Sequence, residues 1–311
     1  MRIIALIFSL LVGCRPHKSD FTVKGKYEDV LYASIENGEI NFVAKGLEGQ
    51  IVFSKNFVRH RLPIQGHALR ALIIEDNLYL VSKEKSSNIG ENKYVLSIFD
   101  IQTLNLVVAD TINGSGRYPA VYKYLDQGIV VHCYRNDSSY YRIIDSDNLV
   151  TSWNKYDGVY WLESNDDKVL YYNRFGLHIS NELEDSSFSF GINSSSGSIN
   201  DKFIAYIDDA SEEISVCTIE DLNCWNSLDL NNFPLNISLG EESMIVLCTK
   251  EKRNEIGYFF DTNEYIVYFF ELDKGVLELK NEKHVSIGAK PRLFKNCYVE
   301  IHEGCLKIWK H

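Results

Sequence analysis

Cysteine is the residue type in this sequence best suited to covalent chemistry, and the 311 residues include seven. Cys217 and Cys224 flank the segment TIEDLN. If Glu220 and Asp221 form the centre of a hairpin, the two thiols face each other across paired strands and could form a disulfide. The alternative is that they are two small apolar strand residues without a bond.

The other thiols and the histidines show no spacing that favours metal binding or catalysis. Cys133, Cys248 and Cys297 each lie in an apolar run, which is typical of buried free cysteine. No CxxC pair and no Cys/His cluster with zinc-finger spacing occurs. The motifs HExxH and GxSxG, the phosphate-binding loop and the EF-hand are also missing. The sequence therefore predicts no metal, no cofactor and no catalytic residue.

The N-terminus combines Arg2 with an apolar run over residues 3–12, interrupted only by Ser9. That run has about half of the ~20 residues needed to cross a bilayer core. A charge followed by a short apolar run is typical of a secretory signal. The run ends in Leu-Val-Gly-Cys at residues 11–14, which resembles the lipobox of bacterial lipoproteins. The resemblance implies cleavage before Cys14 and lipidation of Cys14. The alternatives are an ordinary signal peptide or a frayed apolar N-terminus, either of them with a chance cysteine.

The residue after the lipobox indicates a destination. Lipoproteins retained at the inner membrane of enteric bacteria typically carry Asp there, whereas this chain has Arg15, so the resemblance favours the outer membrane. Acyl chains anchor through buried methylenes, at about 0.8 kcal/mol per CH₂. We expect residues 1–13 to be a removed lipoprotein signal peptide, residues 14–20 a lipidated N-terminus with a short linker, and residues 21–311 one domain tethered in the bacterial envelope.

Charge restricts the class of partner. The formal net charge is −11, and it becomes −12 once Arg2, the charged residue of the signal, is removed. This balance argues against a nucleic-acid partner, because phosphates need a basic face. It also argues against broad electrostatic adhesion to anionic lipid, so we expect membrane contact through the lipid anchor alone. A protein partner is compatible with this negative charge, and a basic protein would be attracted by it.

Beyond the signal, the sequence shows strand periodicity and no helical stripe. Runs of β-branched and aromatic residues, about five to eight long, alternate with Asp, Asn, Gly or Lys. These runs recur as a unit: a first strand, a tight polar turn, a more apolar second strand, a variable loop and a hairpin. One unit reads LRALII, EDN and LYLVS, followed by a loop and YVLSIFDIQTLNLVVADTI.

The spacing of these units predicts the architecture. We place the ends of successive third strands at Lys45, Asp100, Asp145, Asn181, Thr218, Glu271 and Lys310, about 44 residues apart on average. Four strands per repeat of this length are typical of a β-propeller blade. The sequence therefore predicts an all-β propeller with seven four-stranded blades. Six or eight blades and another all-β fold, such as a pair of sandwiches, are the alternatives.

The last predicted unit ends at CLKIWKH after three strands. Its fourth strand could come from the N-terminal segment FTVKGKY, but that segment also serves as the first strand of the first unit. The resemblance to propellers covers most of the chain at the level of repeat architecture. It extends to no named family, because the Gly-His and Trp-Asp signatures of WD40 repeats are missing.

Loops are where propellers usually carry function. Connections from fourth to first strands share one face with connections from second to third strands, so we expect a partner to bind there. This predicted loop face includes SSSGS at 194–198 and several cations. Arginine and tyrosine are enriched in interaction hot spots. The candidate binding residues are Arg59, His60, Arg61, Arg117, Tyr118, Arg135, Arg253 and Arg292.

Three functions agree with these observations. The first is a non-catalytic, membrane-tethered lipoprotein that binds another protein through the loop face. The second narrows the first to an immunity lipoprotein that neutralises a toxic effector in the periplasm. The third is an enzyme, a lyase or hydrolase of envelope glycans with a site at the channel mouth. The missing catalytic motifs favour the first.

Overall fold

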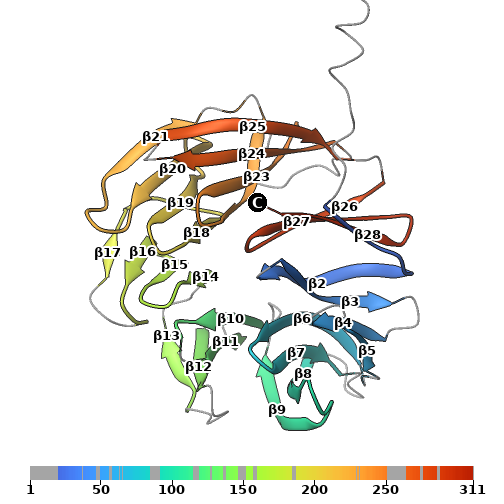
Figure 1. Cartoon of the computed structure of the whole chain (residues 1–311). Coiled ribbons are helices and arrows are strands. Elements are labelled where there is room, and N and C mark those ends of the chain that lie inside the picture. Colours follow the sequence, from blue (N-terminus) through green and yellow to red (C-terminus); the bar gives the residue numbers. More distant parts are fainter. Residues whose placement is uncertain are drawn as a thin grey trace, which may run out of the picture.

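The computed structural model describes residues 20–310 except 37, 47–49, 56–57, 63, 65, 85–91, 115–118, 127, 136–137, 146–151, 157–159, 184–186, 229, 231, 251–263, 274–275 and 286–287. The strands form seven four-stranded antiparallel sheets, arranged as blades around a central axis (Figure 1). This confirms the predicted all-β propeller and its count of seven blades. Within the part of the chain that is described, no helix is long and apolar enough to cross a lipid bilayer.

Blades 1 to 4 each use four consecutive strands, which follow one another from the axis outward. Blade 1 contains β2 (Tyr27–Glu36), β3 (Glu39–Gly46), β4 (Ile51–Lys55) and β5 (Val58–Leu62). Blade 2 contains β6 (His67–Ile74), β7 (Asn77–Lys83), β8 (Asn92–Asp100) and β9 (Leu106–Gly114). Blade 3 contains β10 (Ala120–Tyr124), β11 (Gly128–Arg135), β12 (Ser138–Asp145) and β13 (Asn154–Tyr156). Blade 4 contains β14 (Trp161–Ser164), β15 (Val169–Asn173), β16 (Gly176–Ser180) and β17 (Phe188–Ser189).

Blades 5 and 6 follow the same plan, and blade 7 joins the two ends of the chain. Blade 5 contains β18 (Gly197–Ile199), β19 (Phe203–Asp208), β20 (Glu213–Thr218) and β21 (Cys224–Leu228). Blade 6 contains β22 (Phe233–Leu239), β23 (Ser243–Thr249), β24 (Tyr265–Asp273) and β25 (Val276–His284). Blade 7 contains β26 (Lys290–Phe294), β27 (Cys297–His302), β28 (Cys305–Lys310) and, outermost, β1 (Phe21–Val23).

Ring closure answers the question that the segment FTVKGKY left open, because the segment is divided. Phe21–Val23 forms β1, which pairs antiparallel with β28, whereas Tyr27 already begins β2 of blade 1. The amide of Tyr27 donates to the carbonyl of Gly304 at 3.0 Å, so the short connection between the two strands is held against blade 7. One segment therefore completes the last blade and starts the first.

One marker of the repeat was placed on the wrong strand. Lys45 lies in β3, the second strand of blade 1, and the third strand ends at Lys55. The strands β3 and β4 both read as short apolar runs, so the sequence pattern did not separate them. With Lys55 as the marker, the spacing to Asp100 falls to about 45 residues, close to the average of the other repeats.

The hydrophobic core lies between the blades. Buried apolar side chains form seven clusters, each drawn from two neighbouring blades. Each blade of the ring is covered on both faces by its two neighbours. This explains why second strands such as β7 and β23 are apolar nearly throughout. Burial on both faces therefore explains why the second strand is the most apolar strand of the repeat.

Serine side chains connect the inner strands of adjacent blades. Ser164 Oγ donates to the carbonyl of Lys123 and accepts from the amide of Leu125, both at 3.0 Å. On β18, Ser198 Oγ accepts from the amide of Leu239 at 2.9 Å. These bonds satisfy backbone groups at the free edge of each inner strand, which would otherwise stay unpaired near the axis.

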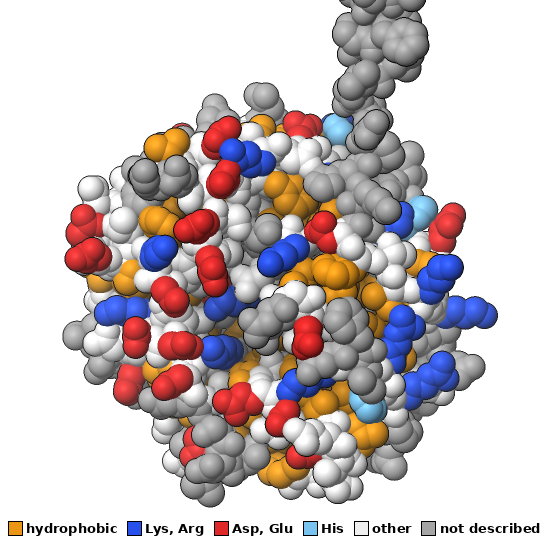
Figure 2. All heavy atoms as spheres, viewed as in Figure 1, with side chains coloured by type: hydrophobic (Ala, Val, Ile, Leu, Met, Phe, Trp, Pro, Cys, Tyr) orange, Lys and Arg blue, Asp and Glu red, His pale blue; other side chains and the backbone are white. Residues whose placement is uncertain are grey.

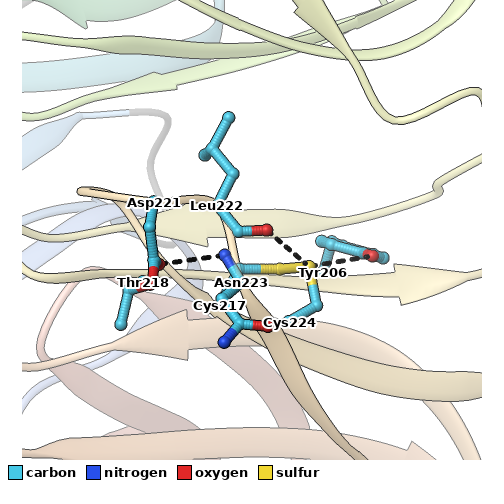
Figure 3. Close-up of a disulfide and its surroundings, with 7 residues drawn as sticks. All are labelled: Tyr206, Cys217, Thr218, Asp221, Leu222, Asn223 and Cys224. Carbon is cyan, nitrogen blue, oxygen red and sulfur yellow. Dashed lines mark hydrogen bonds between the residues drawn. A yellow bond between two sulfur atoms is a disulfide. The ribbon is translucent and has the colours of Figure 1, made fainter.

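The hairpin predicted around Glu220 and Asp221 is present, and Cys217 and Cys224 are disulfide-bonded across it (Figure 3). The side chain of Asp221 accepts hydrogen bonds from the Thr218 hydroxyl and the Asn223 amide. These bonds lower the pKa of Asp221, with the Thr218 bond contributing most. Cys133, Cys248 and Cys297 are buried, as expected.

A partly buried tyrosine is expected to make the fold sensitive to alkali. Burial raises the pKa of Tyr122 to about 12, although the nearby Arg70 guanidinium opposes the shift. The unfolded chain releases this proton near its ordinary pKa of 10, so stability from the protonated phenol is lost as pH rises from 10 through about 12. We expect Tyr122→Phe to lose less stability than the parent between pH 9 and 11, measured as urea midpoints. Tyr160→Phe, at an exposed ring, is the control, and equal losses in all three proteins would contradict the assignment.

Candidate functional site

A pocket of about 560 Å³ lies where blades 4 and 5 meet. Its walls come from the segments before β14 and β18, from the turns that follow β15 and β19, and from Trp161 and Tyr172 at the adjoining ends of β14 and β15. These are fourth-to-first and second-to-third connections, so the pocket opens on the predicted loop face. The lining residues are Tyr160, Trp161, Tyr172, Arg174, Ser194, Ser195 and Asp209.

Hydrogen bonds fix the polar side of the pocket. The Ser195 amide donates to Asp209 Oδ1 at 3.1 Å, and the Asp209 amide donates to the Asn193 carbonyl at 3.0 Å. Trp161 Nε1 donates to the Ser194 carbonyl at 3.0 Å. The connection into blade 5 is therefore held by both blades, and the pocket is preorganised before any ligand arrives.

A glycine makes room for the tryptophan. A Cβ atom placed on Gly197 would lie 2.5 Å from Cη2 of Trp161, closer than real contacts allow. Because Gly197 has no side chain, the indole can lie close against the start of β18. The glycine of the SSSGS segment thus leaves the space that Trp161 occupies in the pocket wall.

The other side of the pocket is aromatic and partly open to solvent. The rings of Tyr160 and Tyr172 have centroids 5.4 Å apart, and Tyr160 is 43% exposed. Beside them, the Arg174 guanidinium lies 4.6 Å from the ring centroid of Phe175, which is 60% exposed. Aromatic rings and arginine supply large, stiff contact surfaces at binding interfaces.

The ionisable groups suit binding. Burial, then the negative charge of Asp209 and the neighbouring Tyr160, raise the pKa of Tyr172. Its hydroxyl therefore stays protonated at neutral pH, and it donates to Asn193 Oδ1 at 3.3 Å. Among the described residues, no group of three or more His, Cys, Asp or Glu side chains could hold a metal ion. The site offers stacking, hydrogen bonds and one cation to a ligand.

Three of the predicted binding residues lie in a strand, so their placement in a loop is wrong. Arg59, His60 and Arg61 belong to β5, the outermost strand of blade 1, which pairs along its length with β4. The Arg59 and Arg61 side chains are exposed, and His60 stacks on Phe53 with centroids 5.0 Å apart. An outer strand buries only alternate residues, so this one resembles a polar loop in sequence.

Arg292 is also in a strand, contrary to the prediction. It lies in β26, the inner strand of blade 7, where its guanidinium is 3.3 Å from the Asp29 carboxylate of blade 1. The preceding proline suggested a loop, but an inner strand has one free edge, and an edge strand tolerates proline. Arg117, Tyr118, Arg253 and Cys14 lie outside the described residues, as does the side chain of Arg135, which ends β11.

Of the predicted loops, SSSGS at 194–198 reaches the pocket, through its first two serines. Sequence reasoning missed the aromatic wall and Arg174. A signal was present in the sequence, because aromatic residues adjoin the polar turns in VYWLES and YYNRFG. Aromatic residues in strands usually belong to the hydrophobic core. Only the packing of blade 4 against blade 5 shows that these aromatic residues line a pocket.

A half-buried carboxyl, Glu163, and a lysine lie near the axis of the ring. Lys295 Nζ, from the β26–β27 turn of blade 7, donates to the Ser164 carbonyl of blade 4 at 3.4 Å, so this side chain crosses the axis. Glu163 Oε1 accepts from Ser198 Oγ at 2.9 Å. Burial raises the pKa of Glu163, while Lys295 and the Ser198 bond act in the opposite direction. Glu163 is thus engaged in bonds that join the blades.

The ring is similar to propellers of known structure. It matches a chain of the mitotic checkpoint complex with a TM-score of 0.60 and 9% identity over 95% of both chains. It matches BBS1N in complex with ARL6DN with a TM-score of 0.53 and 11% identity over 93% of this chain and 95% of that one. It matches BamB from Moraxella catarrhalis with a TM-score of 0.52 and 10% identity over 91% and 86%.

At such low identity these matches show the fold alone. No protein-family model matches the sequence, and no curated protein matches it. The chemistry of the pocket must therefore be argued from its own residues.

Proposed function

We propose that this chain is a membrane-tethered lipoprotein of the bacterial envelope whose propeller binds another protein through the loop face. The tether rests on the lipobox resemblance at residues 11–14. The outer membrane is the favoured location, because Arg15 follows the lipidated cysteine.

The observation that carries protein binding is the pocket between blades 4 and 5. It joins three aromatic rings, an arginine and hydrogen-bonding groups in one preorganised wall, next to the exposed ring of Phe175. Tyr, Trp and Arg dominate the binding energy at protein interfaces. Two propellers of similar fold come from structures of protein complexes, one with ARL6DN and one of the mitotic checkpoint complex.

Partner capture tests the pocket. We expect the double variant Arg174→Ala/Phe175→Ala to recover at least about tenfold less partner from detergent-solubilised membranes than the parent, because hot-spot truncations cost about 2 kcal/mol or more. Leu106→Ala, at a 52% exposed side chain of blade 2, is the matched control and should recover as much as the parent. Equal recovery by the pocket variant and the control would rule out the pocket as the docking site.

The tether has its own test within the same strain. The parent protein should sediment with membranes, and the peptide beginning at Cys14 should carry the mass of its acyl chains. Cys14→Ser should move the protein to the soluble fraction. An unmodified Cys14, or sedimentation that survives the substitution, would overturn the lipoprotein assignment while leaving the pocket test intact.

A further inference from the structure

Four exposed cations gather where the outer strands of blades 7 and 1 meet. Lys24 and Lys26 lie in the connection from β1 to β2, and Arg59 and Arg61 lie on β5. We propose that this basic rim contacts the anionic lipid headgroups of the membrane to which the chain is tethered. The inference rests on the proposed lipid tether and adds a second contact to it.

The geometry of the rim brings its cations together. Arg59 Nη1 donates to the Lys24 carbonyl at 3.0 Å, which joins β5 to the connection that follows β1. Arg59 and Arg61 are two residues apart on one strand, so both point to the same side. Tyr27 is within electrostatic range of both arginines. The rim is therefore one surface built from two blades.

The local charge is opposite to that of the whole chain. Glu28 at the start of β2, Glu303 in the adjoining β27–β28 turn and Asp20 just before β1 are exposed acidic residues beside the rim, so the four cations still leave a local excess of positive charge. The chain as a whole carries −11. In Figure 2 lysine and arginine side chains lie along the right edge of the molecule, whereas acidic side chains crowd the left. The net charge of the chain therefore does not describe this edge, and a local contact with anionic lipid is compatible with it.

The position of the rim relative to the proposed anchor favours lipid as its partner. Five residues separate Cys14 from Asp20, which directly precedes β1. A chain of that length spans at most about 20 Å. Blade 7, which contains β1, must therefore stay near the membrane, and the basic rim is on this side of the ring.

A basic patch beside a lipid anchor has a physical role. The acyl chains hold the protein at the membrane by burial of their methylenes, and a basic patch adds an electrostatic contact that sets which side of the domain faces the lipid. Each Lys or Arg near an anionic surface strengthens binding about fivefold. In the ring, blades 4 and 5 lie across the axis from blade 1 (Figure 1). Contact through the rim would thus leave the pocket pointing away from the lipid.

Vesicle binding by the unlipidated chain tests the rim separately from the anchor. We expect full-length Cys14→Ser to bind vesicles of 30% phosphatidylglycerol in phosphatidylcholine, to bind pure phosphatidylcholine at least about tenfold more weakly, and to dissociate as salt is raised. Adding Arg59→Gln and Arg61→Gln should weaken binding to the anionic vesicles by about tenfold or more. Lys93→Gln/Lys280→Gln, which removes two exposed cations from blades 2 and 6, is the matched control.

The outcomes separate the rim from the tether and from a protein partner. Equal binding to both vesicle types, or equal loss in the rim and control variants, overturns the inference even if Cys14 is lipidated. Rim variants that bind vesicles normally but recover less partner protein overturn it in favour of an acidic protein. Circular dichroism would reveal whether loss of the hydrogen bond from Arg59 to the Lys24 carbonyl disturbs folding. In that case the variant Lys24→Gln/Lys26→Gln, which keeps that bond, tests the rim instead. An unlipidated Cys14 refutes the tether, whereas vesicle binding still reports on the rim.

Discussion

Deletion of residues 1–23 is expected to lower the melting temperature by about 10 °C, whereas deletion of residues 1–19 should leave it nearly unchanged. The first deletion removes β1, the outermost strand of blade 7. The second keeps it, together with Asp20, whose Oδ2 accepts from the Lys310 amide at 2.7 Å. The strand pairs Phe21, Thr22 and Val23 with Ile308, Lys307 and Leu306.

The expected size follows from what β1 buries. Val23 is 8% exposed and belongs to the core cluster between blades 7 and 1, against which Phe21 also packs. Exposure of two such side chains costs about 3 kcal/mol, and the lost ladder bonds add about 2 kcal/mol. A loss of about 5 kcal/mol lowers the melting temperature of a large domain by about 10 °C.

Calorimetry of the two truncated proteins measures this difference directly. The shorter deletion is the control, because it removes the same N-terminal residues apart from the strand and Asp20. Equal melting temperatures for the two proteins would show that ring closure by β1 contributes little. Phe21→Asp/Val23→Asp in the full chain should reproduce the loss without any truncation.

Lys283→Ala is expected to destabilise the fold by about 3–5 kcal/mol. Lys283 lies on β25 of blade 6 and forms an ion pair with Glu300 of blade 7, whose side chain is 1% exposed. Tyr298 donates to the same Glu300 oxygen at 2.7 Å, and Lys283 Nζ lies 4.4 Å from the Trp309 ring centroid. Without the lysine, the buried carboxylate would lose its countercharge.

The neighbouring tyrosine reports on this arrangement. Burial, then the charge of Glu300 and its hydrogen bond, raise the pKa of Tyr298. The phenol thus stays a donor to the carboxylate, and the cluster of lysine, glutamate and tyrosine joins blades 6 and 7. Removal of one charge of the Lys283–Glu300 pair leaves the other buried without a countercharge. A single substitution should therefore lower the free energy of unfolding more than replacement of both residues.

Urea unfolding of three variants tests the ion pair. Lys283→Met/Glu300→Leu replaces both charges by apolar side chains and should recover most of the stability lost in Lys283→Ala. Lys280→Ala removes an exposed lysine from the same strand and should change stability little. A double variant as unstable as the single one, or a single variant close to the parent, would contradict the expected role of the pair.

Much of the fold could be predicted from the sequence, because it depends on local spacing. Alternation within strands, turn residues between them and a repeat near 44 residues indicate a seven-bladed propeller. The disulfide between Cys217 and Cys224 belongs to the same class, since a hairpin of a few residues brings the two thiols together. The strands, turns and disulfide each join residues that are close together in the chain. The strand-and-turn pattern also recurs in each of the seven blades.

The sequence alone predicted the blade architecture, placed Cys217 and Cys224 across a hairpin and carries the lipobox resemblance on which the proposed tether rests. Only the tertiary structure decided how β1 is used, that Arg59 and Arg61 lie on an outer strand, and that residues from Tyr160 to Asp209 form one pocket. The physical reason is that contacts between blades depend on how each sheet is rotated against the next. That rotation brings distant turns together without leaving any periodic pattern in the chain.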